Sequence, residues 1–115
     1  MAWNALKRAA QTFESKLRMY HLLLAMGFKE IEVGMPCANH SEYEFIRHLV
    51  DADLISAGVL VQAITPCSEP AVQRTIESLH GASQAISFTY LPTSDNNYRE
   101  TILGDSEEEW IARAV

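Results

Sequence analysis

Residues 29–37 read Lys-Glu-Ile-Glu-Val-Gly-Met-Pro-Cys, and this stretch sets the pattern for the rest of the chain. It predicts a short buried strand that ends in a Gly/Pro turn, because proline cannot continue a central strand. It also places one carboxylate, Glu32, between Ile31 and Val33. An acid among apolar neighbours is costly unless it is paired or used, so Glu32 is a candidate for a structural ion pair or for an active site.

The same unit recurs further along the chain. Residues 59–65 form a second apolar run that leads into a Pro-Cys pair at 66–67, as the first run leads into 36–37, and residues 85–90 form a third run. Apolar residues at helical spacing predict four helices around these strands, over about 13–26, 41–50, 69–79 and 106–115. Alternating helices and apolar strands are typical of βα units whose parallel sheet is buried on both faces.

Capping residues and apolar positions refine the predicted helices. Ser41 with Glu44 predicts a capping box at the start of the second helix, and Ser106 with Glu109 predicts one for the last helix. The core-facing residues predicted for the second helix are Phe45, Ile46, Leu49 and Val50. Those predicted for the third helix are Val72, Ile76 and Leu79.

Composition bounds the class of protein. A chain of 115 residues with 48% hydrophobic and 21% charged residues fits one globular domain. Its formal charge of −6 disfavours nucleic acid or a membrane as a partner, because both attract basic surfaces. The longest apolar run, residues 22–26, is too short to span a bilayer. Cys37 and Cys67 predict free, buried thiols in a reducing compartment, either the cytoplasm or, in a eukaryote, the mitochondrion.

Three parallel strands are too few to close a barrel, and they leave two open edges that invite pairing with other chains. A piece of a larger α/β barrel explains this arrangement better than a complete small domain. We therefore expect residues 13–115 to form part of a barrel, after an N-terminal lead-in over residues 1–12. The open edges also favour a homo-oligomer.

Residues 15–23 and 26–36 resemble the start of 2-isopropylmalate synthase, a member of the Claisen-condensing metallo-barrels that also include homocitrate synthase. They read Ser-Lys-Leu-Arg-Met-Tyr-His-Leu-Leu and Met-Gly-Phe-Lys-Glu-Ile-Glu-Val-Gly-Met-Pro. Further stretches that fit in the same order are residues 42–47, 61–65, 74–82 and 90–95, and Arg99. Their order and spacing make the resemblance specific from about residue 15 to the end.

The resemblance implies a pyruvate carboxyltransferase-like (β/α)₈ TIM barrel, of which this chain holds the second to fourth strands and four helices. Members of the family are acyltransferases that join acetyl-CoA to 2-oxoisovalerate (3-methyl-2-oxobutanoate), which yields 2-isopropylmalate in leucine biosynthesis. In the full-length family a divalent metal (Mg, Mn or Zn) polarises the keto group, and a base takes a proton from the acetyl methyl group. The enolate carbon then attacks the keto group.

The resemblance also carries over five site residues. Glu32 matches the family's acidic residue on strand two and is the predicted catalytic residue. The predicted substrate-binding residues are Gly34 and Pro36 in the turn at the barrel mouth, Thr65 at the mouth end of strand three, and Tyr90 on strand four.

The chain departs from the family pattern at the metal ligands. The family's Arg-Asp-Gly stretch on strand one would lie before residue 13, and residues 1–11 contain nothing like it. No two of the four histidines stand two residues apart, so the family's His-x-His pair is also absent. Many relatives have a histidine on strand four where residues 87–89 read Ser-Phe-Thr. We therefore predict that this chain alone binds no metal and is inactive.

Two other interpretations stay open. The first is a homocitrate or citramalate synthase-type relative, because the parts of the barrel that select the 2-oxo acid are missing. The second is a non-catalytic α/β protein that is stabilised by pairing its open edges in an oligomer.

Overall fold

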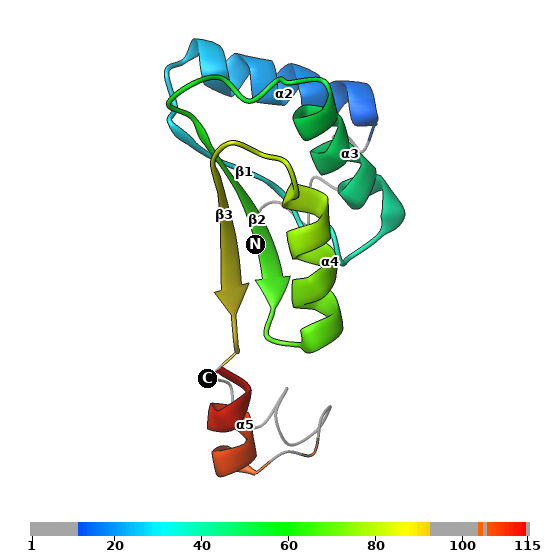
Figure 1. The fold of residues 1–115 in the computed structure, drawn as a ribbon, viewed down its shortest axis with the longest axis vertical. Coiled ribbons are helices and arrows are strands. Elements are labelled where there is room, and N and C mark those ends of the chain that lie inside the picture. The colour runs from blue at the N-terminus through cyan, green and yellow to red at the C-terminus, as the bar shows by residue number, and fades with distance from the viewer. Residues whose placement is uncertain (1–11, 93–103, 105, 115) are drawn as a thin grey trace.

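The computed structural model of the protein describes residues 12–92, 104 and 106–114 (Figure 1). In chain order its elements are α2 (Phe13–Ala25), β1 (Glu30–Gly34), α3 (His40–Asp51), β2 (Leu60–Pro66), α4 (Glu69–Leu79), β3 (Ala85–Tyr90) and α5 (Glu107–Ala114). The predicted alternation of helices and strands is confirmed. Of the predicted lead-in over residues 1–12, only Thr12 lies within the described residues; its side chain caps α2 by accepting from the Ser15 N–H at 3.1 Å.

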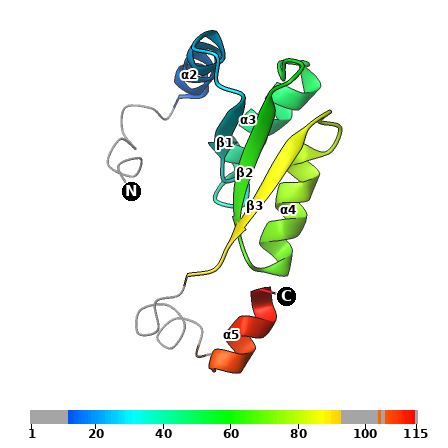
Figure 2. The same cartoon turned by 90° about the vertical axis from the view of Figure 1, so that its left-hand side faces the viewer.

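The three strands form one parallel sheet in the order β1-β2-β3, which confirms the predicted α/β class. Figure 2 shows α3 and α4 on the same side of this sheet, and α2 packs against β1. We call the opposite side, which carries Glu32, Gln62, Ile64, Ile86 and Phe88, the open face. No helix of the described part of the chain covers the open face, whereas the sequence predicts cover on both faces. A (β/α)₈ barrel fills its interior with side chains from all its strands, and three strands supply only a part of them.

The core lies between the sheet and the helices. Alternate residues of β1 and β2 point into it, so Ile31, Val33, Val61 and Ala63 are buried. The helices contribute Tyr20 from α2 and Phe45, Ile46 and Leu49 from α3. This confirms the predicted core face of α3, with the half-buried Val50 packed against it.

The start of α3 differs from the prediction. Asn39, not Ser41, is the N-cap, and its side chain accepts a hydrogen bond from the Glu42 N–H at 3.0 Å. Glu42 therefore takes the third helical position, from which a capping box would send its carboxylate back to the Asn39 N–H. Glu42 instead binds Lys16 and the Met35 N–H, which lie outside α3. The predicted box at α5 is confirmed, because Ser106 and Glu109 bond reciprocally at 2.8 and 3.2 Å.

The predicted bounds of α4 are confirmed, but its predicted core face is wrong in part. Ala71, Thr75 and Ser78 are its buried residues, whereas Ile76 is 53% exposed. Small side chains let the helix approach the sheet closely. The buried hydroxyls are satisfied within the helix, since Thr75 donates to the Ala71 carbonyl at 2.9 Å and Ser78 to the Thr75 carbonyl at 2.7 Å. Of the three predicted core residues, Leu79 packs against the core.

The two cysteines follow the ends of β1 and β2. Cys37 and Cys67 are both free, as predicted, but they are half-buried rather than buried. None of the helices in the described ranges is long and apolar enough to cross a membrane.

Candidate functional site

Parallel strands end at the same edge of the sheet, and the predicted site residues gather along that edge. β1 ends at Gly34, β2 at Pro66 and β3 at Tyr90. Just beyond the end of β2, the Cys67 N–H donates a hydrogen bond to the Tyr90 carbonyl at 3.0 Å. Active sites of (β/α)₈ barrels lie at this carboxyl edge, where the βα loops meet.

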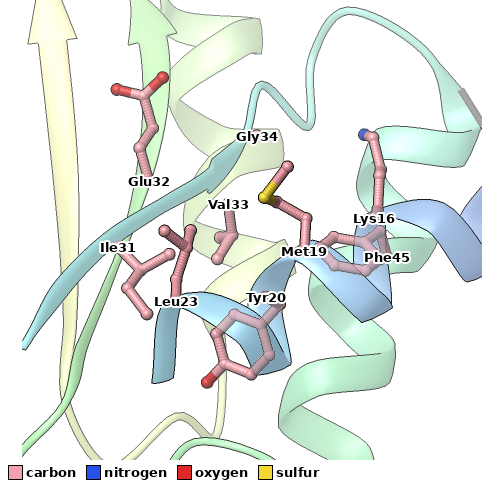
Figure 3. Close-up of a pocket in the computed structure, with 9 residues that line it drawn as sticks. All are labelled: Lys16, Met19, Tyr20, Leu23, Ile31, Glu32, Val33, Gly34 and Phe45. Carbon is pink, nitrogen blue, oxygen red and sulfur yellow. The ribbon is translucent and has the colours of Figure 1, made fainter. Parts of the chain in front are cut away.

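Glu32 lies on the open face, two residues before the end of β1. Its side chain points away from those of Ile31 and Val33 (Figure 3), so it is exposed although its sequence neighbours are buried. The carboxylate accepts a hydrogen bond from Gln62 Nε2 at 3.3 Å. Glu32 takes part in none of the ion pairs found among the described residues, so the structural ion pair is not formed there. Its catalytic role stays a prediction.

Sequence reasoning missed Gln62, which lies beside Glu32 in the register of β1 and β2. The signal that could have found it is the offset between the two Pro-Cys turns. Residues thirty apart take equivalent positions in the two units, and Glu32 and Gln62 are 30 residues apart. An amide can donate to a carboxylate through its nitrogen, so Gln62 can orient the Glu32 carboxylate on the open face.

The other predicted residues differ in how far their side chains reach. Pro36 is fully buried in the turn after β1, and Thr65 is fully buried near the end of β2. Thr65 Oγ1 donates to the Pro66 carbonyl at 3.4 Å. Tyr90 is half-buried at the end of β3, where it pairs with Pro66 in the register. Pro36 and Thr65 therefore shape the edge from within, whereas Tyr90 reaches its surface. The role of all three in substrate binding stays a prediction.

Gly34 lies at an irregularity in the pairing of β1 with β2. Its φ is +151°, a conformation that residues with a side chain rarely adopt. A Cβ on Gly34 would meet the carboxylate of Glu42 on α3. Glu42 and its partner Lys16 are residues of this edge that sequence reasoning also missed. The signal for them was a glycine at the end of a buried strand.

A pocket of about 430 Å³ lies between α2 and β1 (Figure 3). Its walls are mainly apolar and include Met19, Leu23 and Ile31. Tyr20 also lines it; its hydroxyl donates to the Leu54 carbonyl at 3.0 Å, and burial raises the pKa of this phenol above its usual value. Glu32 also lines this pocket, but its carboxylate points away from the other lining side chains (Figure 3).

The described residues do not by themselves fit a metal ion. They contain no group of three or more His, Cys, Asp or Glu side chains that could hold one. One pair of histidine with an acid is formed, His40 Nε2 with Glu44 Oε1 at 3.1 Å, and it is exposed at the start of α3. A zinc site takes three or four protein ligands. A zinc ion at the carboxyl edge would therefore need donors from outside the described ranges.

The chain matches a protein family and several curated proteins. Residues 4–115 match the family model described as HMGL-like. The chain is 57% identical over 104 residues to an isopropyl malate synthase of Alternaria alternata, and the alignment covers 90% of this chain and 18% of that protein. It is 48% identical over 102 residues to a 2-isopropylmalate synthase of Kineococcus radiotolerans, with 89% and 18% covered. It is 41% identical over 103 residues to that of Schizosaccharomyces pombe, again with 89% and 18% covered.

The chain thus spans about 18% of the length of these curated relatives. Their names confirm the resemblance to 2-isopropylmalate synthase. HMGL-like domains are metal-dependent TIM barrels, and the three parallel strands with their helices are part of such a barrel. Because the family model matches nearly the whole sequence, this chain belongs to the HMGL-like family.

Proposed function

We propose that this chain is part of an acyltransferase barrel that condenses acetyl-CoA with 2-oxoisovalerate, the reaction of a 2-isopropylmalate synthase in leucine biosynthesis. The observation that carries the proposal is the 57% identity to an isopropyl malate synthase over 104 residues. The parallel strand ends support it, because they bring the predicted site residues to one edge. The rest of the barrel would supply donors for a divalent metal (Mg, Mn or Zn).

In this proposal Glu32 is the catalytic group that the chain brings to the site. An exposed carboxylate near a strand end can accept a proton or a hydrogen bond from a bound substrate. Gln62 holds it from β2 at 3.3 Å, which favours one orientation of the carboxylate. Tyr90 offers a phenol at the end of β3, and Gly34 and Pro36 form the turn beside Glu32.

The test begins with the genomic DNA and transcript on both sides of this reading frame. The longest continuous product is assayed for release of free CoA thiol from acetyl-CoA, with 2-oxoisovalerate as the second substrate. Parallel assays replace it by 2-oxoglutarate or pyruvate, the acids that a homocitrate or citramalate synthase would use. The fastest release with 2-oxoisovalerate supports the proposal. A preference for another acid assigns the corresponding relative, and no release with any acid overturns acyl transfer.

Glu30 provides a matched control for Glu32. Both glutamates are exposed on β1, and Glu30 lies two residues farther from the carboxyl edge. We expect E32Q to lower the rate of CoA release by a factor of about 10² or more, the usual contribution of an acid–base group, and E30Q to leave it unchanged. Equal rates in E32Q and the unmodified protein would remove Glu32 from the proposed site.

A second candidate is a non-catalytic protein held in a homo-oligomer. It is favoured by the outer edges of β1 and β3, which pair with no other strand of the described residues. Phe88 on the open face is also 46% exposed. Sedimentation over a range of concentrations tests it: a defined oligomer without CoA release supports this candidate, and a monomer excludes it. The free cysteines support a reducing compartment, cytoplasm or mitochondrion, for either candidate.

A further inference from the structure

The end of β1 carries a β-bulge. Glu32 pairs with Gln62 and Gly34 pairs with Ala63, so Val33 is an extra residue between two successive pairs. Val33 is buried on the helix side, and a Cβ on Gly34 would also point to the helix side, where it meets the carboxylate of Glu42. Two consecutive residues of β1 therefore face α3. The second of them is a glycine because Glu42 fills the space of its side chain.

Glu42 has two partners, one for each carboxylate oxygen. Its Oε2 accepts a hydrogen bond from the Met35 N–H at 3.2 Å, in the turn that follows the bulge. Its Oε1 forms an ion pair with Lys16 Nζ on α2. The two side chains are only 21% and 15% exposed, and Lys16 Nζ also lies 5.4 Å from the centre of the Phe45 ring. One carboxylate thus joins α2, α3 and the end of β1.

We propose that Glu42 is a positioning residue for the turn over residues 34–36, and that Lys16 holds Glu42 in place. A bulged strand end lacks regular ladder hydrogen bonds, and Glu42 supplies an acceptor to the Met35 N–H at this point. The turn carries Gly34 and Pro36, so the consequence for catalysis rests on the proposed function. The geometry of the turn does not rest on it.

The contacts require a carboxylate of this length. Glutamine offers one acceptor oxygen, and its NH₂ group would face either the Lys16 ammonium or the Met35 N–H, both of which are donors. The aspartate side chain is one methylene shorter than that of glutamate, so from α3 it would not reach both partners. Alanine leaves the ammonium and the N–H without this partner.

Hydrogen exchange of the Met35 amide in the ¹⁵N-labelled 115-residue chain tests the proposal. We expect E42A to speed exchange at Met35 about tenfold, the effect of losing one charge-assisted hydrogen bond, and E42Q and K16M to speed it less. Amides in the middle of β2 should keep their rates. E44Q is the matched control. Glu44 lies one half-turn further along α3, and its ion pair in the described residues is with the exposed His40. K16R keeps the positive charge, so the Met35 amide should exchange as slowly in K16R as in the unmodified protein.

The charge-swapped double variant K16E/E42K separates positioning from simple ion pairing. It restores opposite charges but leaves the Met35 N–H facing a lysine, which has no acceptor. We expect the double variant to have a higher unfolding midpoint than the single variants K16E and E42K, while exchange of the Met35 amide stays fast. The proposal is overturned if Met35 exchanges equally fast with and without Glu42, or if the swap restores slow exchange at Met35. Neither measurement uses acetyl-CoA, so a failed acyl-transfer assay and a failed exchange test are distinguishable.

Discussion

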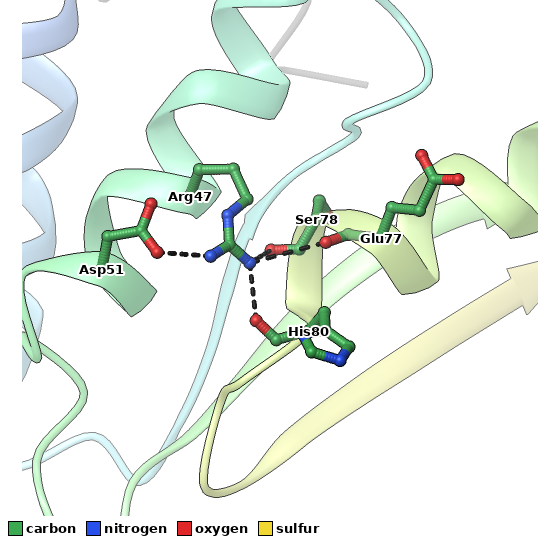
Figure 4. A network of polar contacts seen from close by, with 5 residues as sticks. All are labelled: Arg47, Asp51, Glu77, Ser78 and His80. Atoms are coloured by element: carbon green, nitrogen blue, oxygen red, sulfur yellow. Dashed lines mark hydrogen bonds and ion pairs between the residues drawn. The ribbon is translucent and has the colours of Figure 1, made fainter.

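Arg47 on α3 donates a hydrogen bond from Nη1 to the His80 carbonyl at 2.6 Å, immediately beyond the end of α4 (Figure 4). The same nitrogen lies 3.2 Å from the Ser78 carbonyl, and the other nitrogen forms an ion pair with Asp51. The last carbonyls of a helix have no partner within the helix, and a cation there also complements the helix dipole. α4 has no basic residue in its own last turn, so the neighbouring helix provides one.

We therefore expect R47A to lower the free energy of unfolding by about 1–3 kcal/mol, the range for a charged group whose hydrogen-bond partners are left behind. R47K should recover only part of it, because lysine lacks the planar fork. Urea unfolding followed by circular dichroism measures the change. R18A removes an exposed arginine on α2 and serves as the control. Equal losses in R47A and R18A would contradict the capping role.

Gly34 and Gly58 separate backbone strain from steric conflict. Both have positive φ, +151° and +76°, but a Cβ meets the Glu42 carboxylate only at Gly34 and open space at Gly58. G58A should cost about 1 kcal/mol and G34A clearly more, because it adds the conflict with Glu42 to the strain. Unfolding in urea compares the two. A loss of stability in G34A no larger than that in G58A would mean that the Glu42 side chain can move aside freely.

Tyr20 makes the stability of the fold depend on pH in the alkaline range. Burial raises the pKa of its phenol in the folded state, so the neutral form is favoured there. The contribution is complete below the unfolded pKa of 10.0 and is lost as the pH rises through the higher folded value. Y20F should lower the free energy of unfolding by about 1 kcal/mol at pH 7, since the Leu54 carbonyl loses its donor. Above pH 10 the free energy of unfolding of Y20F should fall less steeply than that of the unmodified protein. Parallel stability curves for both proteins above that pH would refute the assignment.

The tight contact of α4 with the sheet predicts a large loss of stability at one position and a small change at the next. T75L inserts a larger side chain at a fully buried site and should destabilise the fold by about 1–3 kcal/mol. I76A changes a residue that is 53% exposed and should shift the stability by less than about 0.5 kcal/mol. Thermal unfolding of the two variants decides between the buried face found here and the apolar face predicted from the sequence. A larger loss in I76A would favour the latter.

Local patterns in the sequence were enough for the order of the elements. The bounds of α4, the Ser106–Glu109 capping box and the alternation of helix and strand depend on residues within about four positions of one another. The identity of the predicted site residues came from the resemblance, and their shared edge follows once the strands are parallel. Hydrophobic periodicity is a local property, which is why these features could be read from the chain alone.

The partner that each polar group takes depends on contacts between residues far apart in the sequence. Glu32 meets Gln62, and Glu42 leaves its own helix start for Lys16 and Met35, because the parallel register and the bulge bring distant residues together. α4 buries Thr75 rather than Ile76 because small side chains allow close approach to the sheet, a gain that apolar spacing does not register. Local sequence patterns thus predict the elements and their order, whereas packing across the sheet selects the contacts at its carboxyl edge.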